Sequence, residues 1–475
     1  MKQNHYKNIT PWNLDLGLIR VLPVVFLFGI LFFDEEVLLP FLLLIFSIFC
    51  YCIATYKYRF IFGFSGIRIL SIPSIMIITF TLFIAFPSIY VISTVSDPAE
   101  TPYISSIILF YPLFCTGLLT ANSLNKVDNN NLNDMLYQTI TPSKNDDFFY
   151  NILINILMFS IFFTIIYLFR VDELPIIELI QNPGNNSKFF LMREEALKLL
   201  KITAIERYTF NWLRSLFIPF GVVGSLFLMS LYKKFKYKVI FILFLVLGLF
   251  INTVTLEKSP LAALVLSIFS FYFLKNLKLK ISTIITSIFI VLLGPLIITY
   301  FIFIDNQNVF QLIFWSYIER LLVVPAKVLY YYFLHFPDTH SFLMGRSSQI
   351  FSWIHPEGTF PISNYIFKLW WNVRESTGSA NANFLGNYWA DFGWYGTIFS
   401  SFVLGIIIQV FTKYILTSSN YEKNINYFVC SAISLPLFTF GFFSSNFTIL
   451  FFTKGLIVLV IILFMINNYK NTNSI

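Results

Sequence analysis

Runs of about 20 apolar residues recur along this chain and constrain its possible folds more than any other feature. A helix of about 20 residues is long enough to cross the roughly 30 Å of hydrocarbon in a bilayer. The chain has 475 residues, of which 57% are hydrophobic and only 12% are charged, whereas soluble domains carry about 25% charged residues. No stretch is left over for a separate soluble catalytic domain. The sequence therefore predicts an all-α polytopic membrane protein, with residues 1–475 forming a single integral membrane domain.

The apolar runs predict about 12 transmembrane helices. The first run contains Arg20 and Pro23 and is followed by acidic residues rather than by small residues of a cleavage site. We therefore expect it to be a retained helix and not a signal peptide. The predicted spans are centred near Phe26, Phe46, Thr81, Pro112, Phe159, Phe227, Leu247, Ile268, Ile290, Val403, Leu435 and Leu459.

The basic residues predict how the spans are oriented. Lys and Arg gather in the loops after the second, sixth and eighth spans, for example Lys233 to Lys238 after the sixth. Such loops face the cytoplasm in most membrane proteins. The connections after the first, third and eleventh predicted spans contain no Lys or Arg, so we expect them on the opposite side. The pattern predicts that both termini lie in the cytoplasm. Phe, Ile, Asn, Tyr and Lys are abundant and share AT-rich codons, which is typical of genes from AT-rich bacteria, so we expect a bacterial inner (cytoplasmic) membrane protein.

Several function classes receive no support from the sequence. The net charge is +8, but the lysines lie in short loops between spans rather than in a patch, so we expect no nucleic-acid partner. All four cysteines lie inside apolar runs, which is untypical of disulfides or metal sites. The motifs of nucleotide-binding loops, serine hydrolases and zinc proteases are absent from the sequence. We therefore predict no metal and no cofactor.

Two segments, 170–214 and 305–391, are too long to be simple connections between spans, and the orientation rule places both outside. Long loops in membrane proteins are often functional. In the first loop, 188–201 has the pattern of a helix lying on the membrane surface. The positive and negative charges of the whole loop 170–214 nearly cancel. A phosphate-binding site there would need some of the loop's cations, which include Arg193, Arg207 and Arg214, to converge. In the second loop, 310–336 is apolar but interrupted by charges, which favours a re-entrant or interfacial helix.

The stretch from Asn383 to Gly396 combines glycines, aromatic rings and Asp391 at a predicted membrane boundary. Ionisable residues near hydrocarbon are costly and are commonly functional. Asp391 is a candidate for an active or substrate-binding site, and the alternative is an N-terminal cap for the helix that follows. The neighbouring rings of Tyr388, Trp389 and Trp394 can stack on sugars or form an interfacial belt.

Two further charged pairs lie near predicted membrane boundaries. Glu257-Lys258 occupies a tight turn between the seventh and eighth spans, and Glu319-Arg320 lies within 310–336. Each pair has two interpretations. The cations can bind the diphosphate of a lipid-linked substrate. Alternatively, the first pair caps a helical hairpin and the second neutralises itself on an amphipathic segment.

The chain resembles the Wzy-type polymerases of bacterial surface polysaccharides, also called O-antigen or oligosaccharide repeat-unit polymerases. Three features carry the resemblance: many spans with two large outer loops, the segment from Asn383 to Gly396 continuing to Gly405, and the outer turn Leu256 to Pro260 with its basic residue. The resemblance implies a glycosyltransferase that joins undecaprenyl-diphosphate-linked oligosaccharides into O-antigen, capsule or exopolysaccharide. It also implies membrane lipids and a chain-length regulator as partners.

Under this hypothesis the candidate site residues divide into three groups. A catalytic group near the acceptor hydroxyl acts as a base, cations stabilise the leaving diphosphate, and aromatic rings bind sugars. The catalytic candidates are Asp391, His355 and Glu319; the diphosphate-binding candidates are Arg320, Lys258, Arg346, Arg193 and Arg207; the sugar-binding candidates are Tyr388, Trp389 and Trp394.

Two other functions are compatible with the same architecture. A flippase for lipid-linked glycans also has about 12 spans, but it usually carries charges deep within its helices and has short outer loops. Here the middle of each predicted span is nearly uncharged and the outer loops are long. A ligase that moves a finished glycan from the same lipid to another acceptor shares the chemistry and remains the closer alternative.

Overall fold

Every regular element in the described part of the computed structural model is a helix, which confirms the all-α prediction. The chain divides into two compact units. Unit 1 comprises Met1–Tyr137, Ile318–Tyr414 and Gly441–Ile449, and unit 2 comprises Gln138–Tyr317, Ile415–Phe440 and Leu450–Ile475. The structure describes residues 14–57, 71–95, 97–124, 140, 146–171, 174–181, 192, 195–196, 203–254, 257–276, 286, 289, 296, 300, 311, 319–348, 355, 357–371, 378–420, 424–443 and 446–472.

Seven helical segments within the described residues are long and apolar enough to cross a membrane, and four shorter apolar helices accompany them. A membrane protein with several spans is therefore supported. Eleven of the predicted span centres lie inside helices, while the centre at Ile290 lies outside the described residues. The seven long segments are Glu35–Thr55, Ile72–Ile92, Glu100–Leu124, Asp146–Leu168, Ile205–Tyr232, Phe235–Val254 and Phe384–Ser418.

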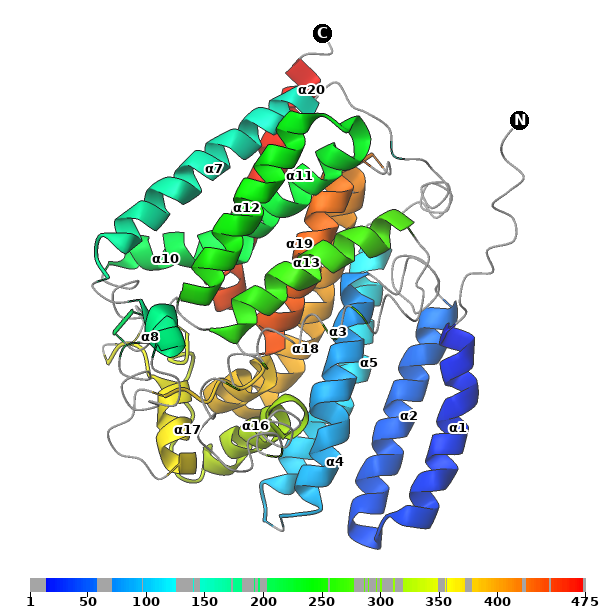
Figure 1. Cartoon of the computed structure of the whole chain (residues 1–475). Helices are drawn as coiled ribbons and strands as arrows, with labels where there is room; N and C mark the ends of the chain where they lie inside the picture. The colour runs from blue at the N-terminus through cyan, green and yellow to red at the C-terminus, as the bar shows by residue number, and fades with distance from the viewer. Residues whose placement is uncertain are drawn as a thin grey trace, which may run out of the picture. The chain divides into compact units, whose positions relative to one another are not determined.

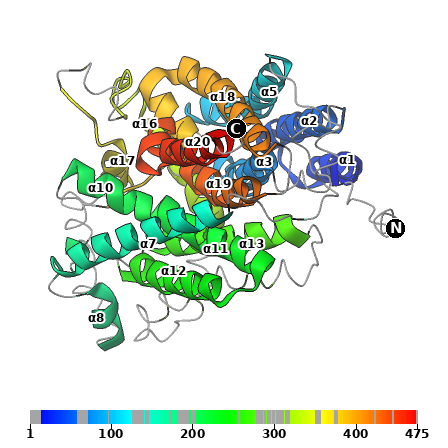
Figure 2. The ribbon, with the colours of Figure 1, turned by 90° about the horizontal axis from the view of Figure 1, so that it is seen from above.

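Unit 1 begins with a helical hairpin, in which α1 (Leu14–Phe32) and α2 (Glu35–Lys57) lie side by side (Figures 1 and 2). Gly29 permits this packing, because a Cβ atom there would lie 2.1 Å from the ring of Phe41. The other elements of unit 1 are α3 (Ile72–Phe80), η3 (Thr81–Ala85), α4 (Phe86–Ile92), α5 (Glu100–Leu124), η5 (Glu319–Val323), α16 (Val324–His335), α17 (Ile362–Trp371) and α18 (Phe384–Ser418), which runs into unit 2 after Tyr414. The labels η3, η4, η5 and η7 denote π-helical turns.

Helix α16 is fixed against the first half of unit 1 by a buried hydrogen bond. The fully buried hydroxyl of Tyr103 on α5 donates to the carbonyl oxygen of Ala326 on α16 at 2.9 Å, and the same hydroxyl lies 2.6 Å from the Ser88 oxygen on α4. The segment 310–336, for which we expected a re-entrant or interfacial helix, thus contains η5 and α16 in its described part.

Helices α5 and α18 cross at two glycines. A Cβ atom at Gly117 would lie 2.1 Å from the carbonyl oxygen of Phe402, and one at Gly405 would lie 2.3 Å from that of Phe114. Small residues let helix backbones approach closely inside a membrane, where packing replaces the hydrophobic effect as the force that holds helices together. This crossing holds the helix that carries Asp391 against α5.

Unit 2 is built around a hairpin of α11 and α12, with α7 beside it (Figures 1 and 2). Phe428 of α19 packs against Phe227 of α11 and Phe271 of α13. The elements of this unit are α7 (Asp146–Leu168), α8 (Pro175–Gln181), α10 (Ala204–Trp212), η4 (Leu213–Phe217), α11 (Ile218–Tyr232), α12 (Phe235–Val254), α13 (Lys258–Asn276), α19 (Ile425–Phe443, to Phe440), η7 (Ile449–Thr453, from Leu450) and α20 (Leu456–Thr472). Most of the predicted surface helix, 188–201, lies outside the described residues.

The two ends of the unit 2 helices differ in character. At one end the Tyr232 hydroxyl donates to Asp146, and the Lys236 ammonium lies 3.7 Å from the Asp147 carboxylate. The opposite end contains a small apolar cluster of Tyr167, Phe210, Leu213 and Val254. The basic loop that follows α11 therefore lies at the end of the helices away from Leu213.

Substitution of Gly117 by leucine is expected to destabilise the protein strongly, because no side chain fits between the backbones of α5 and α18. Overpacking a core typically lowers the free energy of unfolding by about 1–3 kcal/mol. We expect a loss at or above the upper end of this range, because the new side chain would meet backbone atoms, which cannot move aside easily. Thr116→Leu is the matched control, because Thr116 is exposed on the same helix. Thermal unfolding of both purified variants in detergent checks this; equal unfolding temperatures would contradict the close crossing.

Candidate functional site

In unit 1, α18 is kinked at Gly393 and an irregular loop, 343–348, packs against the kink. Gly393 has φ 59° and ψ −135°, a conformation that glycine adopts without steric cost. The backbone N–H groups of Leu343 and Met344 donate to the carbonyl oxygens of Ala390 and Asp391, at 2.9 and 3.0 Å. The kink thus leaves two helix carbonyls available, and the loop provides their partners.

Asp391 is 2% exposed, and its carboxylate is directed to the loop. Its Oδ1 accepts from the backbone N–H of Ser347 at 3.1 Å, and its Oδ2 accepts from the Ser347 hydroxyl at 2.5 Å. The carboxylate therefore fixes loop 343–348, and these bonds are not those of an N-terminal cap on the helix that follows.

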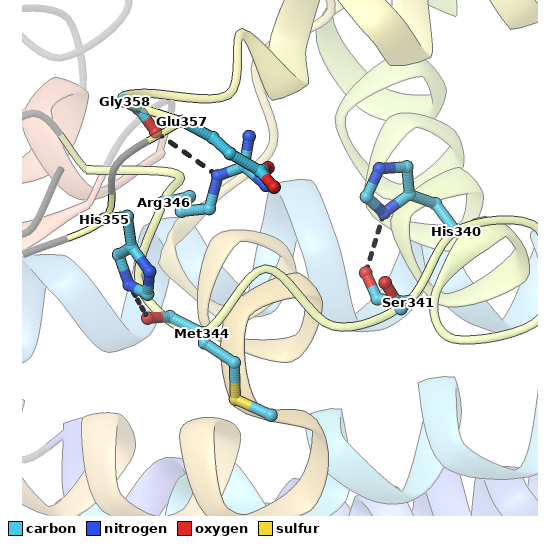
Figure 3. Close-up of polar contacts among 7 residues, drawn as sticks. All are labelled: His340, Ser341, Met344, Arg346, His355, Glu357 and Gly358. Carbon is cyan, nitrogen blue, oxygen red and sulfur yellow. Dashed lines mark hydrogen bonds and ion pairs between the residues drawn. The ribbon is translucent and has the colours of Figure 1, made fainter.

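Figure 3 shows Arg346 of this loop and His355, which follows the loop in the sequence. The Nε2 atom of His355 is 2.8 Å from the carbonyl oxygen of Met344. A carbonyl only accepts, so Nε2 carries the proton and a neutral His355 keeps Nδ1 as its basic atom. Arg346 forms an ion pair with Glu357, and its Nε donates to the Gly358 carbonyl at 3.3 Å. The charge of this arginine is thus matched by a carboxylate from the same segment.

The three predicted sugar-binding rings have different surroundings. Trp389 is only 4% exposed; it stacks on Phe333 with ring centres 4.4 Å apart and donates to the Phe336 carbonyl. Tyr388 is half-buried against Phe447. Trp394 is 39% exposed and offers the most accessible ring surface of the three.

The remaining predicted site residues are dispersed. Glu319 and Arg320 are both exposed, at the start of η5 in unit 1. In unit 2, Arg207 is half-buried on α10, with its guanidinium 5.3 Å from the ring centre of Tyr208. Lys258 is the first residue of α13, but its side chain lies outside the described part of the chain, as does Arg193.

Unit 2 contains a charged cluster that consists of Arg214, Glu257 and Lys454. Arg214 lies in η4 and is 7% exposed, and its Nη2 is 2.5 Å from the Glu257 carboxylate. Lys454 is half-buried between η7 and α20. Burial lowers the pKa of the Lys454 amine, the Arg214 charge lowers it further, and the Glu257 carboxylate raises it. Arg214 and Lys454 thus lie near the same carboxylate.

Two side-chain hydrogen bonds hold Lys454 at this position. The indole N–H of Trp212 donates to the carbonyl oxygen of Phe452 at 2.6 Å. The hydroxyl of Ser215 donates to the carbonyl oxygen of Lys454 at 2.9 Å. Gly455 has φ 85°, and a Cβ atom there would lie 3.1 Å from the Trp212 ring. Side chains from the turn that carries Arg214 therefore bind the backbone around Thr453. These bonds hold Lys454 near Arg214.

Sequence reasoning missed this cluster for identifiable reasons. In the sequence, Arg214 is one of the nearly balanced charges of segment 170–214, and its partner Glu257 lies in another connection. The connection after the eleventh span was expected to contain no basic residue, which is wrong because α20 begins at Leu456 and leaves Lys454 before it. The available signal was a lysine followed by glycine inside an otherwise apolar run.

In the described ranges, no three His, Cys, Asp or Glu side chains come together as metal ligands. Comparisons with protein-family models, curated proteins and solved structures give no match to this chain. The chemistry of the two sites must therefore be argued from their own residues.

Replacement of Ser347 by alanine should loosen loop 343–348, because it removes the hydroxyl that donates to the buried Asp391 carboxylate. A hydrogen bond to a charged group contributes about 1.5–3 kcal/mol, so the loop amides should exchange with solvent about tenfold faster or more. Hydrogen–deuterium exchange of this segment is the measurement, with the exposed Ser341→Ala as control. Unchanged exchange in Ser347→Ala would contradict the anchoring role of Asp391.

Proposed function

We propose that the protein is a polysaccharide polymerase, which joins undecaprenyl-diphosphate-linked oligosaccharide units on the outer face of a bacterial cytoplasmic membrane. The observation that carries the proposal is the cluster in which two cations, Arg214 and Lys454, lie near the carboxylate of Glu257. Two cationic groups held together at a predicted membrane boundary attract an anion. The anion available at a membrane surface to an enzyme of this class is the lipid-linked diphosphate.

The charge pattern of the sequence supports an outer location for this cluster. Arg214 ends the first predicted outer loop, and Glu257 lies in a connection that the same pattern assigns to the outer side. The basic loop around Lys233 to Lys238, for which we expect a cytoplasmic location, follows the other end of α11. This arrangement suits a substrate that is presented after its transfer across the membrane.

Diphosphate binding explains how the cations promote the reaction. In the transfer, the acceptor hydroxyl loses its proton to a base, its oxygen bonds to the anomeric carbon of the donor sugar, and the bond from that carbon to the diphosphate oxygen breaks. Negative charge develops on the leaving diphosphate, where Arg214 and Lys454 would stabilise it. Because the diphosphate leaving group supplies the driving force, the reaction needs no nucleotide and no cofactor.

His355, with Asp391 as its alternative, is the candidate base within unit 1, and it is tested separately from the cluster of unit 2. Neutral His355 has a free basic Nδ1, because its Nε2 is engaged by the Met344 carbonyl. Asp391 is more strongly engaged, since it accepts two hydrogen bonds from Ser347, and Glu319 is an exposed third candidate. Trp394, as the most exposed of the three predicted rings, is proposed to stack on a sugar.

The earlier cation candidates keep secondary roles in this proposal. Arg346 is paired with Glu357 and is proposed to have a secondary role in anion binding. Arg320 is exposed and can contact a substrate from the membrane surface. Lys258 directly follows Glu257 in the sequence and stays a candidate for binding the diphosphate, as do Arg193 and Arg207 as helpers. A chain-length regulator is the proposed protein partner.

The proposal is tested by reconstituting the purified protein in lipid with its undecaprenyl-diphosphate-linked repeat unit and separating the products by size. The wild-type protein should give a ladder that rises in steps of one repeat. Transfer of the intact glycan to a different acceptor would indicate a ligase instead. Movement of the substrate across sealed vesicles without any product would indicate a flippase, and it would overturn the polymerase proposal.

Removal of the Arg214 charge should slow the reaction severely. Loss of one group that stabilises transition-state charge typically costs about 100-fold or more in kcat, so we expect this from Arg214→Gln and a similar loss from Lys454→Met. Arg20→Gln, which removes an exposed arginine of α1, is the matched control and should keep full activity. Normal ladders from both cluster variants, at wild-type protein levels, would contradict the assignment of the diphosphate to this cluster.

A further inference from the structure

Asn252 on α12 is a buried polar side chain with unmet hydrogen-bonding capacity. It is 0% exposed, and neither its amide nitrogen nor its amide oxygen has a hydrogen-bond partner among the described protein atoms. A buried amide without partners costs several kcal/mol in an apolar environment, and an intramembrane polar residue of this kind usually marks a functional position. Asn252 therefore points to a group that is not part of the protein chain.

The packing of α11 against α12 locates Asn252 along the hairpin. Gly221 of α11 lies against the ring of Phe244 on α12, and Gly248 of α12 lies against Ile218 at the start of α11. The two helices are antiparallel. One further turn along α12, beyond Gly248, therefore lies beside the turn that precedes Ile218, which is η4. Asn252, four residues after Gly248 and on the same helical face, therefore comes level with η4 and with Arg214.

A second buried polar group lies around the same turn. Tyr167 on α7 is 4% exposed, and its hydroxyl has no hydrogen-bond partner among the described atoms. Its ring packs in one cluster with Leu213, which precedes Arg214, and with Val254, which lies two residues after Asn252. Two neutral polar groups without partners thus flank the turn that carries the arginine.

The local helix geometry is also unusual at this level. The turn that carries Arg214 is π-helical, and so is η7, which immediately precedes Lys454. Single π-helical turns within α-helices are rare and frequently occur at functional sites. The unpartnered Asn252 and the paired cations are thus independent observations that both indicate a ligand at one end of unit 2.

We propose that Asn252 is a ligand-binding residue, which together with Tyr167 forms the neutral part of an anion site completed by Arg214 and Lys454. The ligand is a phosphate-type anion: the Asn252 amide and the Tyr167 hydroxyl donate to its non-bridging oxygens, and the cations balance its charge. The assignment of this anion to the substrate diphosphate rests on the proposed function. The same chemistry also fits the phosphate of an anionic lipid headgroup.

The test compares the affinities of the wild-type protein and three variants for inorganic pyrophosphate, measured by calorimetry on the full-length chain in neutral phosphatidylcholine nanodiscs. Asn252→Leu keeps the approximate size and removes the donors, so its affinity should fall about tenfold or more. Asn252→Asp places a carboxylate against the anion and should bind more weakly still. Ser267→Ala is the control, because this buried serine of α13 is already bonded to the Ala263 carbonyl, and its affinity should be unchanged.

The unfolding temperature without ligand separates binding from folding. A buried amide without a partner gains nothing from burial, so Asn252→Leu should be at least as stable as the wild type while it binds pyrophosphate less tightly. A purely structural role would not lower affinity and preserve stability together. Wild-type affinity in Asn252→Leu, or no detectable binding by the wild-type protein, would overturn the proposal.

Two further measurements identify the source of the anion and separate this inference from the polymerase proposal. If pyrophosphate binding weakens in nanodiscs that contain phosphatidylglycerol, the occupant is a lipid headgroup; if only the diphosphate-linked repeat unit competes, it is the substrate. Binding that depends on Asn252 in a protein that forms no product ladder would support the anion site and refute the polymerase. A ladder together with full affinity in Asn252→Leu would refute only the role of Asn252.

Discussion

Hydrocarbon offers no hydrogen-bond partner to a polypeptide backbone, so each break in a membrane-embedded helix must be compensated by the protein itself. In unit 1, the kink at Gly393 leaves the carbonyl groups of Ala390 and Asp391 to be bonded by loop 343–348. In unit 2, the end of η7 leaves two carbonyls that Trp212 and Ser215 bind through their side chains. Both breaks bring ionisable residues to defined positions, so the polar chemistry of the molecule is concentrated where its helices are interrupted.

The two sites differ in how their charges are balanced. Arg346 is paired with Glu357, which comes from the same segment, and the Asp391 carboxylate is bonded by Ser347; these interactions mainly hold a loop in place. In the cluster of unit 2, Arg214 and Lys454 both lie near Glu257. Two cations held at one position attract an anion. This contrast is why we assign anion binding to the cluster of unit 2 rather than to Arg346.

Much of the helical framework can be predicted from the sequence, because long apolar runs have few alternatives to helices in a membrane. Eleven of the predicted span centres fall in helices. The glycines and the acidic residue of the stretch around Asp391 indicate a candidate site in the sequence, but they do not predict the hydrogen bonds of Asp391 to Ser347. The charged cluster could not be predicted, because Arg214 and Lys454 lie 240 positions apart in the sequence. The hydropathy of the run around Lys454 also concealed the start of α20 at Leu456.

The most direct test of the assignment is a cryo-electron microscopy structure of the protein in nanodiscs with its undecaprenyl-diphosphate-linked repeat unit bound. We expect density for both phosphates within hydrogen-bond distance of the Arg214 guanidinium, the Lys454 amine and the Asn252 amide. The hydrocarbon chain of the lipid should extend from there along the surface of the protein. Well-defined diphosphate density beside Arg346 or Arg320, with none at Arg214, would contradict the assignment of the anion site to unit 2.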